Sequence, residues 1–256
     1  MEAFSKTLFL NELKKLNAST DRQIIIHKIV DSTSTDLMRR VRIGSAGAGA
    51  VVITDIQTAG RGRRGNTWIS SDPDSLYISL AVTVTGKPSK TLPMVPLSAG
   101  IAAVYALQDQ KFTKARLKWP NDVLVNDKKL GGILCETPNL QAKPLLAIVG
   151  LGLNLGTCDL PADTAGNAVS MASLAKSVIK KETIAAAWIS KMDQRSTNIA
   201  QIVDKWQRCA EPFGRRVKIG DITATTLGLN NLGQLLIKKD DGDVISIPGG
   251  IVENLI

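Results

Sequence analysis

The segment QTAGRGRRG, residues 57–65, is the stretch from which the fold and chemistry of this chain are best approached. Read literally, GRGRRG matches the dinucleotide fingerprint, but that fingerprint needs a helix directly after it. The following stretch NTWISSDP, residues 66–73, is a poor helix start. The P-loop pattern also fails, because it needs Lys and then Ser or Thr where this chain has Asn66 and Thr67. The segment therefore belongs to neither of these two phosphate-binding loops.

Glycine and arginine give this loop a different chemistry. Glycines let the backbone approach a ligand closely, and arginines present planar forks to phosphate or carboxylate oxygens. Arg61, Arg63 and Arg64 repel one another until an anion binds, so we expect the loop to become ordered with its ligand. The alternatives are a solvated basic turn and an RNA-binding RGG-like segment.

Three further segments place polar side chains at predicted strand ends: KWPND (118–122), KLGGILCE (129–136) and GLGLN (150–154). The carboxylate of Asp122 could bind Mg²⁺ or a polar group of a ligand; the alternative is a structural role, in which it accepts a backbone hydrogen bond in an Asx turn. Lys129 stands beside paired glycines, where its ammonium can meet a ligand on bare backbone; alone, it reads as a solvated hairpin charge. Asn154 suits either a nucleotide base edge or a left-handed turn.

Apolar periodicity predicts helices and strands in alternation over the first 210 residues. A helix at 34–43 follows Asp31, Ser32 and Thr33, whose side-chain oxygens suit an N-cap. Further helices are expected at 5–16, 94–108 and about 181–209, the last being one long helix or a pair. Strands are expected at 23–30, 50–55, 75–85, 115–119, 122–126, 129–136 and 144–155.

After Pro212 the sequence changes to short β-rich segments separated by turn residues. Short strands are expected at 215–219, 222–228, 232–238 and 243–247, with turn residues between them. This pattern predicts a small β-barrel appended to the main domain. We therefore divide the chain into residues 1–210 and 211–256.

Composition narrows the class of protein. The chain has 256 residues and a net charge of +9, which favours an anionic partner. The single histidine, His27, excludes a multi-histidine metal site, and a Ser-His-Asp triad would need it at the nucleophile. Its place after an apolar run on a predicted strand favours a structural role instead. The three cysteines fit no zinc site and favour a reducing intracellular compartment. Residues 1–17 lack signal-peptide features, and no apolar run is expected to span a bilayer.

Taken in this order, the segments resemble the biotin–protein ligase family. The resemblance covers about residues 28–156, with a looser match in the C-terminal part. One departure is Ser34, where the family usually has Asn. The resemblance implies an α+β fold, with a mixed central sheet, helices on one side as in class II synthetases, and a small C-terminal SH3-like β-barrel. The matching pieces are Asp31-Ser32-Thr33 and residues 57–65, 118–122, 129–136 and 150–154.

The resemblance also implies roles for individual residues. Catalysis falls to three cations, Lys129, Arg61 and Arg63. The residues placed at the biotin site are Ser32, Thr33, Ser34, Gln57, Gly60, Arg61, Gly62, Arg63, Lys129 and Gly132. Those placed at the ATP site are Arg63, Arg64, Trp68, Asn121, Asp122, Lys129 and Asn154, with Asp122 as the proposed ligand of Mg²⁺.

The activity implied is an ATP-dependent ligase that uses Mg²⁺. It would form biotinyl-5'-AMP from biotin and ATP and pass biotin to a lysine of a biotin carboxyl carrier domain, in the cytoplasm. About 27 residues precede the matched core, too few for the winged-helix domain of some members, so sequence-specific DNA binding is not expected. No membrane partner is expected, and a homodimer is compatible with the sequence. The rivals are a lipoate–protein ligase or lipoyl/octanoyl transferase, and a non-enzymatic nucleic-acid-binding protein.

Overall fold

A seven-stranded sheet forms the centre of the molecule, in the order β1-β2-β3-β7-β6-β5-β4. The computed structural model describes residues 3–70, 72–156, 167–174 and 180–255. Only β1 and β2 pair in parallel within this sheet; the other neighbours are antiparallel, so the sheet is mixed as predicted. The strands are β1 (Ile24–Val30), β2 (Val51–Gln57), β3 (Leu76–Thr83), β4 (Ala115–Lys118), β5 (Asp122–Val125), β6 (Lys128–Glu136) and β7 (Leu146–Leu153).

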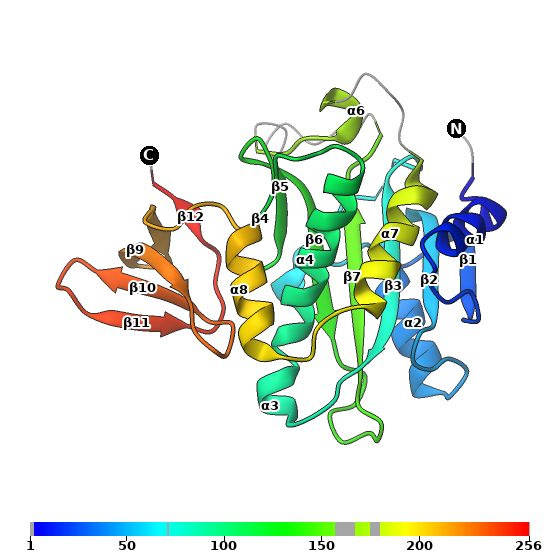
Figure 1. Cartoon of the computed structure of the whole chain (residues 1–256), viewed down its shortest axis with the longest axis horizontal. Helices are drawn as coiled ribbons and strands as arrows, with labels where there is room; N and C mark the ends of the chain where they lie inside the picture. Colours follow the sequence, from blue (N-terminus) through cyan, green and yellow to red (C-terminus); the bar gives the residue numbers. More distant parts are fainter. Residues whose placement is uncertain (1–2, 71, 157–166, 175–179, 256) are drawn as a thin grey trace.

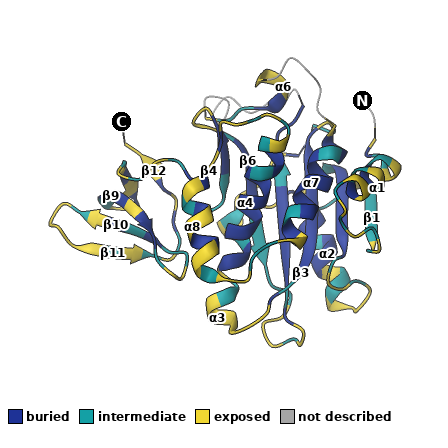
Figure 2. Ribbon diagram, in the orientation of Figure 1, coloured by how far each residue is buried: buried dark blue, intermediate teal, exposed yellow. Residues whose placement is uncertain are grey.

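One face of this sheet carries the main layer of helices (Figure 1). The central helix α4 packs on β4 to β7 and against α7 and α8, while α1 packs on α7. Figure 2 shows the central strands and the inner sides of α4 and α7 buried. The layer of helices on one side is thus confirmed. The helices in this region are α1 (Lys6–Lys15), α3 (Pro88–Thr91), α4 (Met94–Asp109), α6 (Met171–Leu174), α7 (Lys181–Asp193) and α8 (Ile199–Cys209).

The opposite face is covered only in part, by α2 (Thr33–Arg42). Because side chains alternate along a strand, Val51 and Ile53 enter the main core, whereas Val52 enters a second, smaller cluster. Leu37 and Met38 of α2 belong to that second cluster. Among the described residues, α2 also contacts part of β7, and the remainder of this face over β6 and β7 carries the site described below.

A second sheet follows the helical region, in the order β11-β10-β9-β8-β12. Its position beside α8 is clear in Figure 1. The contacts that join it and its leading segment to the main sheet include two hydrogen bonds: Trp119 Nε1 donates to Gly233 O at 3.0 Å, and the amide of Glu211 donates to Leu117 O at 2.8 Å. This antiparallel sheet is consistent with the predicted small barrel. Its strands are β8 (Arg216–Ile219), β9 (Ile222–Leu229), β10 (Leu235–Lys239), β11 (Val244–Ile247) and β12 (Glu253–Asn254).

Several local features differ from the sequence-based expectations. The short elements α3, α6 and β12 were not predicted, whereas the region 181–209, expected as one long helix or a pair, does form a pair. Ser32 occupies the N-cap of α2, but its side chain makes no capping hydrogen bond. The amide of Thr33 donates instead to Oε1 of Gln57 at 2.9 Å, from a strand 24 residues away. The expectation that a local oxygen caps this helix is therefore corrected.

The expectation that no apolar run is long enough to span a bilayer also needs correction. By length and composition, the helical stretch Pro88–Asp109 qualifies. However, 67% of its most apolar window is buried inside the protein. A helix that is apolar all round is typical of a protein core as well as of a membrane span, and here its neighbours are the sheet, α7 and α8.

Candidate active site

A cleft of about 700 Å³ opens on the face of the sheet that α2 leaves uncovered. Its floor is built from glycines of β6 and β7. Gly132 pairs with Gly152 across the two strands, and Gly150 pairs with Leu134. Alternation sends the intervening side chains, such as Ile133 and Leu151, into the main core. The floor is therefore bare backbone, which lets a ligand or another side chain approach the sheet closely.

Trp68 lies on this glycine floor. A Cβ atom on Gly152 would come within 2.7–2.9 Å of the Trp68 ring, and one on Gly132 within 3.2 Å. Nε1 of Trp68 is buried and has no hydrogen-bond partner among the described residues. The ammonium of Lys129 lies 5.7 Å from the centre of the ring, within the range of a cation–π contact. The indole therefore forms one flat wall of the cleft next to a positive charge.

A chain of neutral hydrogen-bonding groups lines one end of the cleft. The hydroxyls of Ser34 and Ser79 lie 2.9 Å apart, and Ser79 donates to Thr33 Oγ1 at 2.8 Å. Gln57 joins the chain, because its Oε1 accepts from the Thr33 amide and its amide nitrogen donates to Ser70 Oγ at 2.8 Å. These groups are held in place by one another, which suits recognition of an uncharged polar ligand group.

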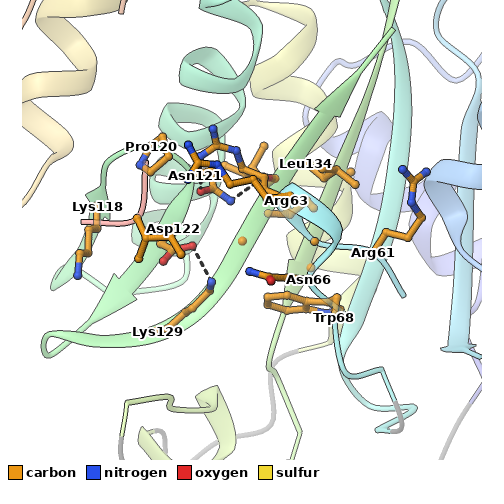
Figure 3. A pocket seen from close by; sticks show the side chains of 18 of the residues that line it. Arg61, Arg63, Asn66, Trp68, Lys118, Pro120, Asn121, Asp122, Lys129 and Leu134 are labelled. Atoms are coloured by element: carbon orange, nitrogen blue, oxygen red, sulfur yellow. Dashed lines mark hydrogen bonds and ion pairs between the residues drawn. The ribbon is translucent and has the colours of Figure 1, made fainter. Parts of the chain in front are cut away.

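Positive charge gathers at the other end (Figure 3). Arg63 Nη1 donates to Asn121 Oδ1 at 3.2 Å, and Nδ2 of Asn121 donates to Ile133 O at 3.0 Å. Burial lowers the pKa of Arg63 below its ordinary value, the charge of Arg64 lowers it further, and Asp122 partly opposes both effects. A guanidinium in this position is stabilised in its charged form by an anionic ligand such as a phosphate group.

Lys129 and Asp122 form an ion pair between neighbouring strands, with 2.7 Å between Nζ and Oδ1. Both side chains are partly exposed, at 38% and 26%. Among the described residues there is no group of three or more His, Cys, Asp or Glu side chains arranged to hold a metal. Asp122 thus offers a single carboxylate, which fits only a cation that takes most of its ligands from water and phosphate, as Mg²⁺ does.

Arg61 takes a different direction from the other cations. Figure 3 shows its side chain pointing away from Arg63, Asp122 and Lys129. Its Nη2 atom lies 2.5 Å from Oε1 of Glu136, and its Nη1 atom is 3.5 Å from Thr35 Oγ1. The sequence placed Arg61 with Arg63 and Lys129 as one catalytic group; in the structure it lines the edge of the cleft and is already ion-paired.

The C-terminal part of the chain closes one side of the cleft. Residues 250–254 belong to its lining. A Cβ atom on Gly249 would lie 3.6 Å from the guanidinium of Arg63 and 3.7 Å from that of Arg64. The arginine–glycine loop thus lies between the main sheet and the C-terminal strands. Arg64 has a φ of 56°, an uncommon left-handed conformation for a non-glycine residue.

Most of the site residues predicted from the sequence are brought together here. Gly60 and Asn154 are the exceptions. A Cβ on Gly60 would lie 2.3 Å from the carbonyl oxygen of Trp68, so this glycine allows a close backbone approach outside the cleft. Asn154 is buried and donates to Val169 O at 3.4 Å. The predicted residues that line the cleft are Ser32, Thr33, Ser34, Gln57, Arg61, Gly62, Arg63, Arg64, Trp68, Asn121, Asp122, Lys129 and Gly132.

The sequence reasoning missed several residues that shape the site. Ser79 is fully buried in β3 and connects Thr33 with Ser34. A hydroxyl inside the apolar run LYISLAVT was the one signal available for it. Glu136 lay within a quoted segment but was given no role, and nothing local connects it with Arg61, 75 residues away. The lining by residues 250–254 had no local signal.

Comparison with known proteins agrees with this geometry. Residues 26–154 match the biotin/lipoate A/B protein ligase family. The chain is 28% identical over 240 residues to the bifunctional ligase/repressor BirA of Escherichia coli, covering 90% of this chain and 74% of BirA. It is 28% identical to a biotin–[acetyl-CoA-carboxylase] ligase of Mycobacterium tuberculosis, and the match covers 90% of this chain and 89% of that ligase. A solved structure, the Aquifex aeolicus biotin protein ligase in complex with biotin and ATP, superposes with a TM-score of 0.75 at 26% identity, covering 91% and 98%.

Proposed function

Because the chain belongs to the biotin/lipoate A/B protein ligase family, we propose that it joins biotin to protein at the expense of ATP. In the first step it would form biotinyl-5'-AMP and release pyrophosphate. In the second it would pass biotin to a lysine of a biotin carboxyl carrier domain and release AMP. The observation that carries the proposal is the division of one cleft into a neutral hydrogen-bonding end and a cationic end.

The neutral end suits the ureido ring of biotin. That ring presents both N–H donors and a carbonyl acceptor, and the cleft offers hydroxyl and amide groups that are already oriented by their neighbours, Thr33, Ser34 and Gln57 among them. Lipoate carries an apolar dithiolane at the corresponding end. A dithiolane has no strong hydrogen-bond donor or acceptor, so it gains no interaction with these groups, whereas the ureido ring can hydrogen-bond to them. The geometry therefore favours biotin over lipoate.

The cationic end addresses the repulsion between the two substrates. A carboxylate of biotin and the α-phosphate of ATP are both anions, so they approach only where positive charge offsets their repulsion. Lys129, Arg63 and Arg64 line this part of the cleft. We assign Arg63 and Lys129 to stabilising charge on the phosphate oxygens, and Trp68 to the wall that the nucleotide contacts. Mg²⁺, when bound, neutralises phosphate charge, and Asp122 is the residue that would hold it once Lys129 turns to the substrate.

The second step needs no nucleophile from this chain. The amine of the acceptor lysine attacks the acyl carbon of biotinyl-5'-AMP, the bond from acyl carbon to phosphate oxygen breaks, and AMP leaves with that electron pair. Lys129 is placed to stabilise the oxyanion that develops. Cys135 lies on β6 and packs against the main core, and burial, reinforced by Glu136, raises its pKa to about 12. It is therefore protonated at neutral pH and is no nucleophile.

The test is incubation of the protein with ATP, biotin and a carrier domain, followed by a streptavidin blot. A parallel reaction with lipoate in place of biotin is read from the mass of the carrier domain, because streptavidin does not detect lipoate. Lys129→Ala and Arg63→Ala should keep the fold and lower the rate by about 10²–10³-fold, the cost of removing one group that stabilises transition-state charge. Lys114→Ala, an exposed lysine outside the cleft, is the matched control. Absence of biotin-dependent pyrophosphate release by the wild-type protein would refute the assignment.

A further inference from the structure

A second groove, of about 560 Å³, adjoins the cleft on its Arg61 side. One wall is the C-terminal half of α2 with the residue that follows it. The other wall is formed by the arginine–glycine loop and the end of β6. The side chains that matter for the argument are Met38, Arg39, Arg42 and Ile43 on the first wall, and Arg61 and Glu136 on the second.

Arg61 is common to the groove and the cleft. Its ion pair with Glu136 and its contact with Thr35 hold the guanidinium between the two spaces. Because Arg61 borders both spaces, a macromolecule seated in the groove would lie next to the cleft. This is the position that a second substrate must take if one of its own side chains is to enter the cleft.

The lining of the groove combines two apolar side chains, Met38 and Ile43, with three arginines and one glutamate. Ile43 is 74% exposed, the highest value among the exposed large hydrophobic residues of the described chain. Its neighbour Arg42 is exposed and forms no ion pair with any described residue. Arg39 and Arg61, by contrast, are already paired with carboxylates of this chain. Arg42 is thus the guanidinium of the groove that remains available to a partner's acidic group.

We propose that this groove docks the acceptor protein of the second reaction step. A carboxylate of the acceptor pairs with Arg42, an apolar side chain of the acceptor covers Ile43, and the target lysine enters the cleft past Arg61. This inference rests on the proposed function, since it names the docking site for the partner of that reaction. Arginine is one of the residue types that are enriched among energetically dominant interface residues.

The experiment measures the two steps separately in the full-length protein. Biotin-dependent exchange between ATP and pyrophosphate reports the first step without any acceptor. Biotin transfer to a carrier domain reports the second. We expect Arg42→Glu and Ile43→Ser each to raise the KM for the carrier domain about tenfold and to leave the exchange rate unchanged. Arg42→Gln, which removes the charge without reversing it, should have a smaller effect in the same direction.

Matched controls lie elsewhere on the surface. Arg208→Glu changes an exposed arginine of α8, and Leu140→Ser changes an apolar side chain that is 66% exposed. Neither should alter the KM for the carrier domain. Reversal of one acidic residue of the carrier domain to lysine should restore transfer by Arg42→Glu, which would identify the paired carboxylate. Raised salt should weaken the wild-type interaction more than that of Arg42→Gln.

The outcomes separate the two proposals. If the wild-type protein shows no exchange, the proposed function fails and the docking site fails with it. If exchange is normal but Arg42→Glu and Ile43→Ser keep the wild-type KM for the carrier domain, only the docking site is refuted. If both variants lose the exchange reaction as well, the groove acts on the cleft itself and the docking assignment is again wrong.

Discussion

Substitution of Gly152 by alanine should weaken ATP binding through Trp68. The added Cβ would lie 2.7, 2.8 and 2.9 Å from Cε2, Nε1 and Cζ2 of the indole. Contacts this short are not tolerated, and these atoms belong to a rigid ring that cannot bend away. Gly152 lies in β7, which pairs with β3 on one side and with β6 on the other. The strand is therefore the fixed partner, and we expect the ring to move.

The size of the effect follows from the energy of overpacking. Forcing an extra carbon into a filled space costs about 1–3 kcal/mol. If the Trp68 ring is pushed off the glycine floor to relieve this strain, the nucleotide loses the flat surface that we expect it to contact. Each 1.4 kcal/mol corresponds to a factor of ten, so the KM for ATP should rise roughly 10- to 100-fold. The KM for biotin should change less, because Ser34 and Gln57 lie at the other end of the cleft.

The assay is biotin-dependent exchange between ATP and pyrophosphate at varied ATP. Gly47→Ala is the control, since a Cβ there meets nothing within 4 Å. Trp68→Ala and the double variant complete a double-mutant cycle, in which Gly152→Ala should have little further effect once Trp68 is absent. A folded Gly152→Ala protein with the wild-type KM for ATP would refute the reasoning, as would additive effects in the cycle.

Two further predictions concern stability. Asp36 is buried, which by itself would raise its pKa, but hydrogen bonds from Arg40, His27 and Arg39 together hold the pKa below its ordinary value. This stabilisation is present at neutral pH and is lost as the pH falls through the folded-state pKa. Asp36→Asn should therefore lower the free energy of unfolding by about 1–3 kcal/mol at pH 7, and the gap between wild type and variant should narrow below about pH 4. Urea unfolding at several pH values measures this gap, and a gap independent of pH would contradict the prediction. Asp55→Asn should lower the free energy of unfolding by about 3–5 kcal/mol, because it leaves the ammonium of Lys181 buried without its carboxylate; the double variant with Lys181→Met should be less damaging, and equal losses in both would count against the reasoning.

Local sequence patterns predicted the elements of the main sheet well. The strand β7 is a continuous run of apolar residues and glycines, and β2 begins with three apolar residues, so their positions follow from residues that are adjacent in the chain. Asn126 and Asp127, between two predicted strands, are residue types typical of a hairpin turn, and both have the positive φ that a tight hairpin needs. The chemistry of the loop 57–65 was likewise visible, because glycine and arginine carry their conformational freedom and charge wherever they stand.

Asn154 shows where such reasoning stops. Gly150 and Gly152 face the cleft, so strict alternation would send the next even position there as well. The strand ends at Leu153, however, and the amide of Asn154 pairs with Leu130 O while its side chain turns toward Val169. A change of one residue in the end of a strand reverses the direction of a side chain, and no local pattern reports it.

By itself, the sequence determined which segments become strands and helices, and which loop carries the cationic chemistry. Only the tertiary structure decided which side chains meet. Gln57 caps a helix that begins 24 residues earlier, Glu136 holds Arg61 across 75 residues, and the C-terminal strands wall the cleft. The physical reason is that local structure depends on neighbours in the chain, whereas a site depends on register and packing between strands that are distant in it.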